Sequence, residues 1–592
     1  MEYSFGPRVS DDGVEFRLWA PLKNDVLLSV EGHESCKMER DRDGWHRSLA
    51  SNAGPGDLYK FVLPDGTEVP DPGSRHQPHD VHGPSEVIDL TSYAWSTNSW
   101  SGRPWEEIVL YELHIGSFTA EGTFRAAIEK LDHLAGLGVT AIQIMPISDF
   151  PGRFNWGYDG VLPYAPDSSY GRPEDLMALV DAAHERSMCV FLDVVYNHFG
   201  PDGNYLPSYA PLFTEHHKTP WGNGINYDGE SSAAIREFII QNAIFWIKEF
   251  RLDGLRLDAV HAIKDDSKEH LLQELARRVR EAADTRHVHL VVENEDNDSE
   301  LLTRDEAGRA TKFTAQWNDD VHHVLHIAAT GETFGYYSDY ADDPSKLGRA
   351  LAEGFVFQGE HMPFRGGNRG KPTYDLTPTA FISFIQNHDQ IGNRALGDRM
   401  VTYRPLDPLK AVATLYLLSP QIPMLFMGEE WGAREPFPYF CDFDEELNRK
   451  VREGRREELS RLPGFDTDEL LDPTAMSTFE MAKLDWSKLA SPQALEMLDL
   501  YRSLLTLRHQ RIVPLLHGSA GRLGAYRQQA GVIHVEWELK NRSTLHLLAN
   551  LSDVSAMMPV PPSGEVIFSL GLATDDAHAP WSVTAIIDRG TI

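Results

Sequence analysis

Short apolar runs alternate with longer amphipathic stretches from about residue 107 to about residue 430. Most positions in each run are hydrophobic, which is typical of parallel strands covered on both faces. One of the runs, 312–316, is weaker because it contains more polar residues. The eight runs cover residues 108–113, 141–145, 190–195, 254–257, 290–292, 312–316, 381–385 and 424–427.

Between these runs, apolar residues recur at helical spacing in segments 124–137, 174–186, 234–250 and 268–283. Strands that alternate with helices predict a parallel sheet. Eight candidate strands favour a closed (β/α)8 TIM barrel over an open doubly wound sheet. No glycine-rich phosphate loop follows any of the runs, which weakens a nucleotide-binding alternative.

Both ends of the chain have a different pattern. Segments 13–20 and 58–63 near the start, and 531–537 and 544–548 near the end, are short and β-like, with turn residues between them. We therefore expect a multidomain α/β protein in which the barrel is flanked by two β-sandwiches. The expected domains are 1–95, 96–510 and 511–592. Within the second, the charged segment 442–461 predicts a solvated helix or an excursion.

Composition narrows the range of partners. The 592-residue chain has a formal net charge of −34, which argues against nucleic acid and anionic membranes as partners. We see no apolar window long enough to span a membrane and no basic segment followed by an apolar stretch at the start, so a cytoplasmic protein is expected. The three cysteines are far apart and give no disulfide framework.

Polar side chains follow several of the predicted strands, where a barrel places its working residues. Arg256 and Asp258 lie two apart and share one face of a strand. Glu293 directly follows another strand, and Asp389 follows a third. Histidines accompany them at positions 198, 261 and 388, and we take His198, His261 and His388 as candidate substrate contacts. Paired carboxylates, one ionised and one protonated, are what cleavage of a glycosidic bond requires.

Each of these residues also has a structural alternative. An Arg-x-Asp pair can be a simple ion pair, and we prefer a structural role for Asp193 and Asp253. Glu295 is the alternative acid to Glu293, which is preferred because it directly follows its strand. A metal-dependent hydrolase would need histidine spacing that the sequence lacks, so no metal and no cofactor is predicted.

Four segments carry a family resemblance. Residues 193–198, 254–261, 293 and 386–389 resemble, in order, the four signature regions of the α-amylase superfamily of retaining glycoside hydrolases. The barrel implied by the resemblance covers about residues 105–510. The amino-terminal β-sandwich resembles the extra domain of glycogen-branching and debranching enzymes.

The resemblance implies specific roles. Asp258 would attack the anomeric carbon and form a covalent glycosyl intermediate, and Glu293 would protonate the leaving oxygen and then activate water. Asp389 would hold the 2- and 3-hydroxyls of the sugar. The further residues implied are Tyr158 as a stacking platform, His198 and His388 as hydrogen-bonding groups, and Arg256 as the residue that orients Asp258.

Segments 316–323, 384–394 and 483–486 resemble the superfamily members that release trehalose from trehalose-capped oligosaccharides. This implies hydrolysis of the α-1,4 bond next to the terminal trehalose of maltooligosyl trehalose. Asn318, Asp319 and Gln390 would recognise the trehalose end, with loop capping as an equally weighted alternative. A branching or debranching enzyme and a non-catalytic α-glucan-binding protein remain open, as does a homodimer.

Overall fold

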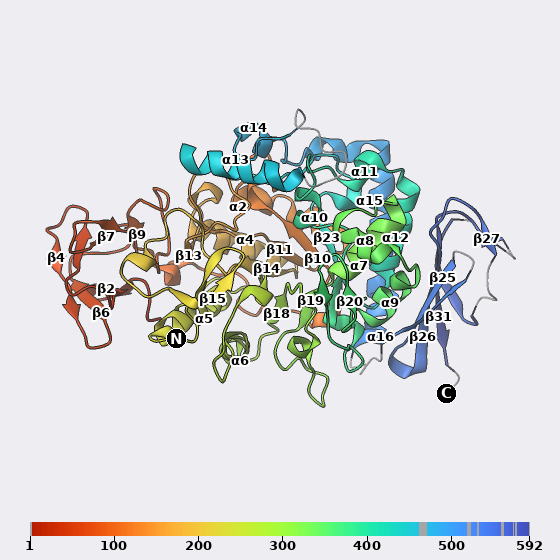
Figure 1. The fold of residues 1–592 in the computed structure, drawn as a ribbon, viewed down its shortest axis with the longest axis horizontal. Coiled ribbons are helices and arrows are strands. Elements are labelled where there is room, and N and C mark those ends of the chain that lie inside the picture. Colours follow the sequence, from red (N-terminus) through yellow and green to blue (C-terminus); the bar gives the residue numbers. More distant parts are fainter. Residues whose placement is uncertain are drawn as a thin grey trace.

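The computed structural model describes residues 3–460, 470–517, 523–529, 532–557, 562–571, 573–574 and 577–590. Arg461 and Gly531, at the ends of two predicted segments, lie outside the described residues. Figure 1 shows an elongated molecule with the amino-terminal sheets at one end, a central barrel, and a carboxyl-terminal sheet at the other end.

The amino-terminal part consists of two small antiparallel sheets. One has the order β1-β2-β6-β5, and in the other β4-β3-β7-β8 is joined by β9, which pairs with β7. Alternate residues of β2 face the space between them, so that Val14, Phe16 and Leu18 are buried. The strands are β1 Arg8–Ser10, β2 Gly13–Trp19, β3 Leu27–Val30, β4 Cys36–Lys37, β5 Glu39–Arg40, β6 Trp45–Ala50, β7 Leu58–Val62, β8 Glu68–Val69 and β9 Ser85–Glu86.

Eight parallel strands then close into a barrel, which confirms the predicted (β/α)8 fold. Each of the eight apolar runs contributes one strand. The strands, in their order around the barrel, are β10 Leu110–Leu113, β11 Ala141–Ile144, β14 Cys189–Val194, β17 Gly254–Leu257, β18 His289–Val292, β19 Ala315–Trp317, β22 Phe381–Ser383 and β23 Ile422–Phe426.

Helices surround the barrel, as the amphipathic segments predict (Figure 1). The predicted segment 124–137 is divided into α2 Phe124–Ile128 and α3 Leu131–Leu137. The charged segment 442–461 forms a helix, α13 Glu445–Leu459. The other long helices are α4 Pro173–Glu185, α5 Ser232–Lys248, α6 Leu271–Ala283, α7 Asp319–Thr330, α9 Ser345–Glu353, α12 Leu406–Leu418 and α15 Pro492–Leu507.

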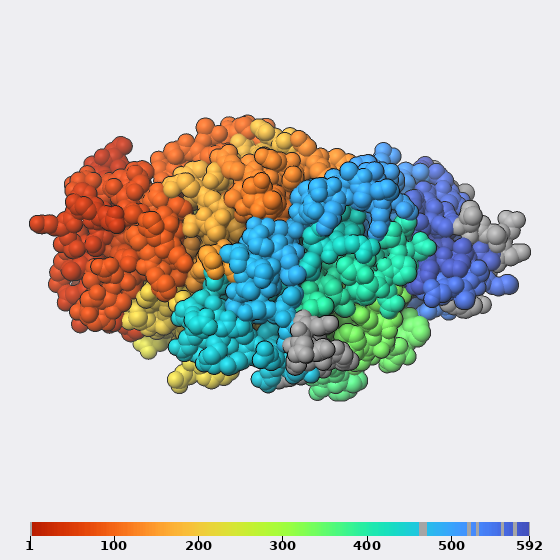
Figure 2. Space-filling model, turned by 90° about the horizontal axis from the view of Figure 1, so that it is seen from above, coloured from red at the N-terminus to blue at the C-terminus, as the bar shows by residue number. Residues whose placement is uncertain are grey.

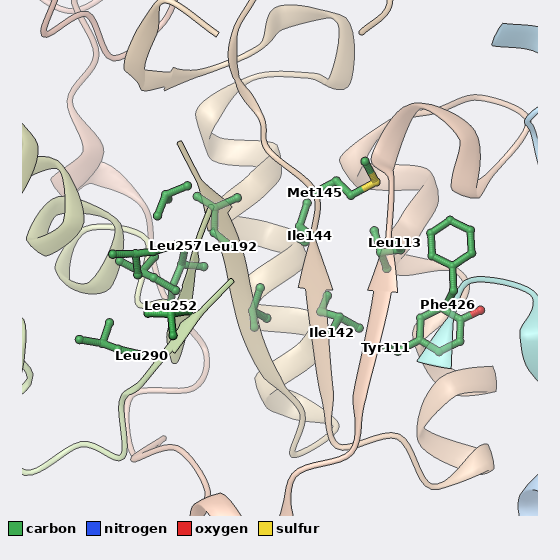
Figure 3. Packing of buried hydrophobic residues seen from close by; sticks show 14 of the residues in the cluster. Tyr111, Leu113, Ile142, Ile144, Met145, Leu192, Leu252, Leu257, Leu290 and Phe426 are labelled. Atoms are coloured by element: carbon green, nitrogen blue, oxygen red, sulfur yellow. The ribbon is translucent and has the colours of Figure 1, made fainter. Parts of the chain in front are cut away.

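Alternate residues of the barrel strands pack into two separate layers. Leu192, Leu257 and Leu290 belong to the large cluster outside the strands, part of which is drawn in Figure 3. Residues of the opposite parity, such as Phe191 and Val291, form a second buried cluster that the closed sheet encloses. Because successive side chains of a strand point to opposite faces, every second residue of each barrel strand faces the barrel interior. At the strand ends, the inward-facing positions are occupied by polar residues.

The carboxyl-terminal part contains a five-stranded antiparallel sheet and a three-stranded sheet of order β27-β30-β29. The three short strands are β27 Ala556–Met557, β29 Ala573–Thr574 and β30 Ala577–His578. This part of the chain packs closely against helix α9 of the barrel. At Gly348 of α9 an added Cβ atom would come within 2.3 Å of the Tyr526 ring, so the contact leaves no room for a larger residue. These sheets are the basis on which we propose domain limits near residues 95 and 510. In sheet order the five strands are β24 Ala525–Gln529, β25 Val532–Glu538, β26 Ser543–Asn550, β31 Ser582–Arg589 and β28 Glu565–Leu570.

Asp253, which precedes β17, is fully buried at the amino end of the barrel strands. Its carboxylate accepts hydrogen bonds from His184 Nε2 at 2.8 Å, Val190 N at 3.0 Å and Arg286 at 3.0 Å. We expect Asp253→Ala to lower the free energy of unfolding by about 3 kcal/mol or more. The change removes the carboxylate that accepts these three hydrogen bonds and leaves the donor groups without an acceptor. Denaturant unfolding measures this loss. The folded fraction should keep its catalytic rate, and unchanged stability would contradict the structural role.

Across the described residues, every helix is too short or too polar to cross a bilayer.

Candidate active site

The side chains of the candidate active site continue the inward-facing series of neighbouring strands. In β14 Asp193 follows Phe191 at a spacing of two, and in β17 Arg256 follows Gly254. Asp193 and Arg256 are direct partners in the parallel register of β14 and β17. Parallel strands end at the same rim, so these polar groups gather at the carboxyl ends of the barrel strands.

Arg256 lies at the centre of this group and is completely buried. Its Nη1 donates hydrogen bonds to Asp193 Oδ2 at 2.7 Å and to Asp258 Oδ1 at 2.8 Å. Its Nη2 lies 4.0 Å from Glu293 Oε2, and the guanidinium carbon lies 4.1 Å from the centre of the Trp317 ring. The guanidinium thus hydrogen-bonds Asp193 and Asp258 through Nη1, and its Nη2 lies near Glu293 without a hydrogen bond to it.

The turn after β17 fixes the position of Asp258. Its Oδ2 accepts a hydrogen bond from Asn197 Nδ2 at 2.8 Å, and its backbone N donates to Val194 O at 3.1 Å. The next residue, Ala259, has a φ of 39°, a left-handed conformation that is costly for a residue other than glycine. This turn lets Ala259 N donate to Glu293 Oε2 at 2.7 Å and links the two carboxylates through the backbone.

Glu293 has the electrostatic surroundings of an acid. Burial raises its pKa well above the usual range, and the negative charge of Asp258 raises it further, against the opposing effect of Arg256. Glu295, the alternative acid, is 58% exposed and lies 3.6 Å from His261 Nε2 instead. Burial and the neighbouring charge therefore favour Glu293 over Glu295 as the carboxyl group that carries a proton.

A buried hydrogen-bond chain supports this pair from the side. His388 Nδ1 lies 2.6 Å from Glu112 Oε1, and His388 Nε2 lies 2.9 Å from the hydroxyl of Tyr158. That hydroxyl donates to Asp193 Oδ2 at 2.8 Å. Burial disfavours a charged His388, but Asp389 and Glu112 outweigh this effect and raise its pKa to about 9. His388 is thus an imidazolium that donates toward Tyr158 and holds its ring at the site.

Asp389 and His198 complete the rim. Asp389 lies in the first turn of α10 His388–Gly392, and its carboxylate is 44% exposed and 3.4 Å from His388 Nε2. His198 Nε2 contacts the carbonyl oxygen of Tyr158 at 2.9 Å. Its ring stacks on Trp221 with a centroid distance of 4.6 Å and an interplanar angle of 13°.

A cleft of about 1040 Å³ opens at this rim. Its size and its mixture of aromatic and carboxylate groups suit several sugar units. Arg256 lies beneath the cleft rather than on its wall. The predicted residues that line it are Tyr158, His198, Asp258, His261, Glu293, His388 and Asp389.

The three residues predicted to recognise the trehalose end are placed differently. Asp319 and Gln390 lie together, with Gln390 Nε2 donating to Asp319 Oδ1 at 3.3 Å, and burial raises the pKa of Asp319 to about 7. Asn318 is fully buried, accepts a hydrogen bond from Val321 N at the start of α7, and donates to Gly354 O at 3.0 Å. It acts as a helix cap, and we do not propose it as a sugar contact.

Several residues of the cleft wall are not predicted from the sequence. Trp221 lies on the hairpin formed by β15 Phe213–Thr219 and β16 Gly222–Ile225. Arg455 and Glu458 come from α13, which lies at the surface of the molecule (Figure 2, cyan). An exposed tryptophan in an otherwise polar segment was the available signal for the hairpin. Because α13 is highly charged, the sequence predicts a solvated helix there and gives no sign that it lines the cleft.

Asp193 offers a test of how the guanidinium is held. We expect Asp193→Asn to lower kcat by about 10- to 100-fold, because the change removes a charge that fixes Arg256 and weakens the acceptor of the Tyr158 hydroxyl. KM should change less than kcat, since Asp193 does not line the cleft. Steady-state kinetics measure both constants. A variant with the kcat of the parent protein would contradict the positioning role.

Comparisons with known proteins agree with this geometry. Residues 84–211 match a family model described as "Alpha amylase, catalytic domain". A malto-oligosyltrehalose trehalohydrolase of Saccharolobus solfataricus is 43% identical over 508 residues, which is 86% of this chain and 87% of that protein. The chain belongs to the malto-oligosyltrehalose trehalohydrolase family. The trehalohydrolase of Deinococcus radiodurans is 42% identical over 85% of this chain and 82% of its own length.

Solved structures give the same assignment of fold. A putative alpha amylase from Salmonella typhimurium is 45% identical and has a TM-score of 0.95 over 99% of this chain and 100% of that chain. A pullulanase from Anoxybacillus, solved with maltotetraose, is 19% identical with a TM-score of 0.70 over 98% of this chain and 87% of that chain, and shows the fold alone. Residues 520–584, in the carboxyl-terminal part, match a domain of unknown function, DUF3459.

Proposed function

We propose that the protein hydrolyses the α-1,4-glucosidic bond next to the terminal trehalose of maltooligosyl trehalose and releases trehalose. The observation that carries this proposal is the pair of carboxylates on Arg256, within a cleft large enough for an oligosaccharide. The names of relatives that are 42–43% identical over most of the chain support the choice of substrate. The net charge of −34 also suits a neutral substrate better than a polyanion.

In the first step, Asp258 attacks the anomeric carbon of the sugar on the non-trehalose side of the bond. Glu293 gives its proton to the departing glycosidic oxygen, and trehalose leaves with an intact hydroxyl group. Arg256 and Asn197 fix the direction of the Asp258 carboxylate by their two hydrogen bonds. Asp389 holds the hydroxyl groups of the same sugar, and Tyr158, whose hydroxyl is in contact with His388 Nε2, offers its ring as a platform.

In the second step, Glu293, now ionised, takes a proton from water, and the water oxygen attacks the anomeric carbon. The bond to Asp258 breaks and the product keeps the original anomeric configuration. The same carboxyl group serves as acid and then as base. Its raised pKa suits both roles, because it carries a proton when the substrate arrives and recovers one when the intermediate breaks down.

The substrate is tested by incubating the protein with maltooligosyl trehalose and with the plain maltooligosaccharide of equal length. We expect kcat/KM to be at least about tenfold higher for the trehalose-capped substrate, because a site that hydrogen-bonds a terminal group discriminates against ligands without it. Free trehalose is measured by chromatography. Equal rates would contradict the proposed substrate, and changed iodine staining of amylopectin would favour a branching or debranching enzyme.

We further propose a cytoplasmic location and leave a homodimer open. Cell fractionation and light scattering of the purified protein test the two points separately. Neither outcome affects the proposed reaction, because the residues assigned to it all come from one chain.

A further inference from the structure

Three potential metal ligands share one face of the carboxyl-terminal sheet, at the end of the molecule opposite the amino-terminal sheets (Figure 1). His534 and Glu536 lie two apart on β25, so both side chains leave the strand on the same face. His546 of β26 is the direct register partner of Glu536. None of the three lines the cleft of the proposed active site.

The donor atoms of these side chains converge. His534 Nε2 lies 3.1 Å from His546 Nδ1, and Glu536 Oε2 lies 3.3 Å from His546 Nδ1 and 3.7 Å from His534 Nε2. A tetrahedral zinc ion with ligand distances of about 2.0–2.1 Å holds its donor atoms roughly 3.3 Å apart. The three atoms therefore already have nearly the spacing of three corners of such a site.

The surroundings suit a cation. Both histidine side chains are about nine-tenths buried, at 12% and 8% exposure, and an imidazole nitrogen without a proton can offer a lone pair to a cation. Two neutral imidazoles and a carboxylate that face one another have more lone pairs than protons to share. Two other charged groups lie near the cluster. The negative charge of Asp588 favours a positive charge at His546. Arg527 lies 3.5 Å from Glu536 Oε1, so the other oxygen, Oε2, remains directed at the histidines.

We propose that His534, Glu536 and His546 bind one divalent ion of the zinc class. Nitrogen and carboxylate donors in tetrahedral spacing are typical of zinc sites, and three protein ligands leave a fourth position for water. The ion would join β25 to β26 and stabilise the carboxyl-terminal sheet. This proposal is independent of the proposed hydrolase activity.

A second group, His216, His217 and Asp266, is the natural comparison among the described residues. His216 and Asp266 are 69% and 75% exposed, and His217 Nε2 already has Asp228 as a partner at 2.7 Å. Adjacent residues of a regular strand point to opposite faces, and a register shift in β15 lets both rings meet. The exposed group is less preorganised, so it provides the control.

The test is calorimetric titration of the chelator-treated full chain with zinc chloride. We expect one equivalent to bind with micromolar or lower Kd and to raise Tm. His546→Ala should weaken zinc binding at least about 100-fold and abolish the rise in Tm. His216→Ala should bind zinc with the affinity of the parent protein and show the same rise in Tm. Activity and circular dichroism establish that each variant is folded. Absence of binding to the parent protein, or equal binding to the folded His546→Ala variant, would overturn the proposal.

Discussion

Asp258→Asn is expected to lower kcat for maltooligosyl trehalose by about 10⁴-fold or more. An amide is a poor nucleophile for the anomeric carbon, and within the described parts of the chain no other carboxylate accepts hydrogen bonds from both Arg256 Nη1 and Asn197 Nδ2. The fold should persist, because Asn keeps the size of the side chain and its Oδ1 can still accept the hydrogen bond from Arg256 Nη1. Initial rates of trehalose release measure the loss.

A matched control is Asp266→Asn, which changes a carboxylate that is 75% exposed in the segment after β17. It should leave kcat within about twofold of the parent protein, as is usual for a surface change. Retention of more than a few per cent of the activity by a pure, folded Asp258→Asn sample would exclude Asp258 as the nucleophile. A covalent glycosyl adduct on Asp258, detected by mass spectrometry, would support it directly.

Much of the fold can be predicted from the sequence because parallel barrel strands are buried on both faces. The runs at 254–257 and 290–292 stand out as apolar for this reason, and they form β17 and β18 almost without correction. The run 312–316 is the poorest match, since β19 begins only at Ala315. Its inward residue, Trp317, packs against the Arg256 guanidinium, a tertiary contact that no local pattern reveals.

The residues of the candidate site also fall into those that the sequence predicts and those that it does not. Asp258 and Glu293 could be predicted as site residues because each follows its own strand, and their roles as nucleophile and acid are implied by the family resemblance. Trp221 and Arg455 could not, because the hairpin and α13 reach the cleft only through the folding of distant segments. Glu112 could not be assigned either, because its role as the partner of His388 depends on a pairing across 276 residues.

The pH dependence of the reaction should follow the protonation of Glu293. Burial and the charge of Asp258 raise its pKa well above the usual range, so the carboxyl group stays protonated at pH values where an exposed glutamate is ionised. Activity requires the protonated form for the first step. We therefore expect kcat/KM to be maintained below the raised pKa and to fall as pH rises through it.

Glu293→Gln tests this assignment, because the amide keeps the shape of the side chain but cannot donate a titrating proton to the leaving oxygen. We expect kcat/KM for maltooligosyl trehalose to fall by about 10²- to 10⁴-fold and the alkaline decline to disappear. With a glycosyl fluoride, whose leaving group needs no proton, the first step should survive and the covalent intermediate should accumulate. Glu295→Gln is the matched control, since its exposed carboxylate contacts His261 and it should keep the pH profile of the parent protein. If Glu295→Gln lost the alkaline decline while Glu293→Gln kept it, the two glutamates would exchange roles and the acid would be the exposed one.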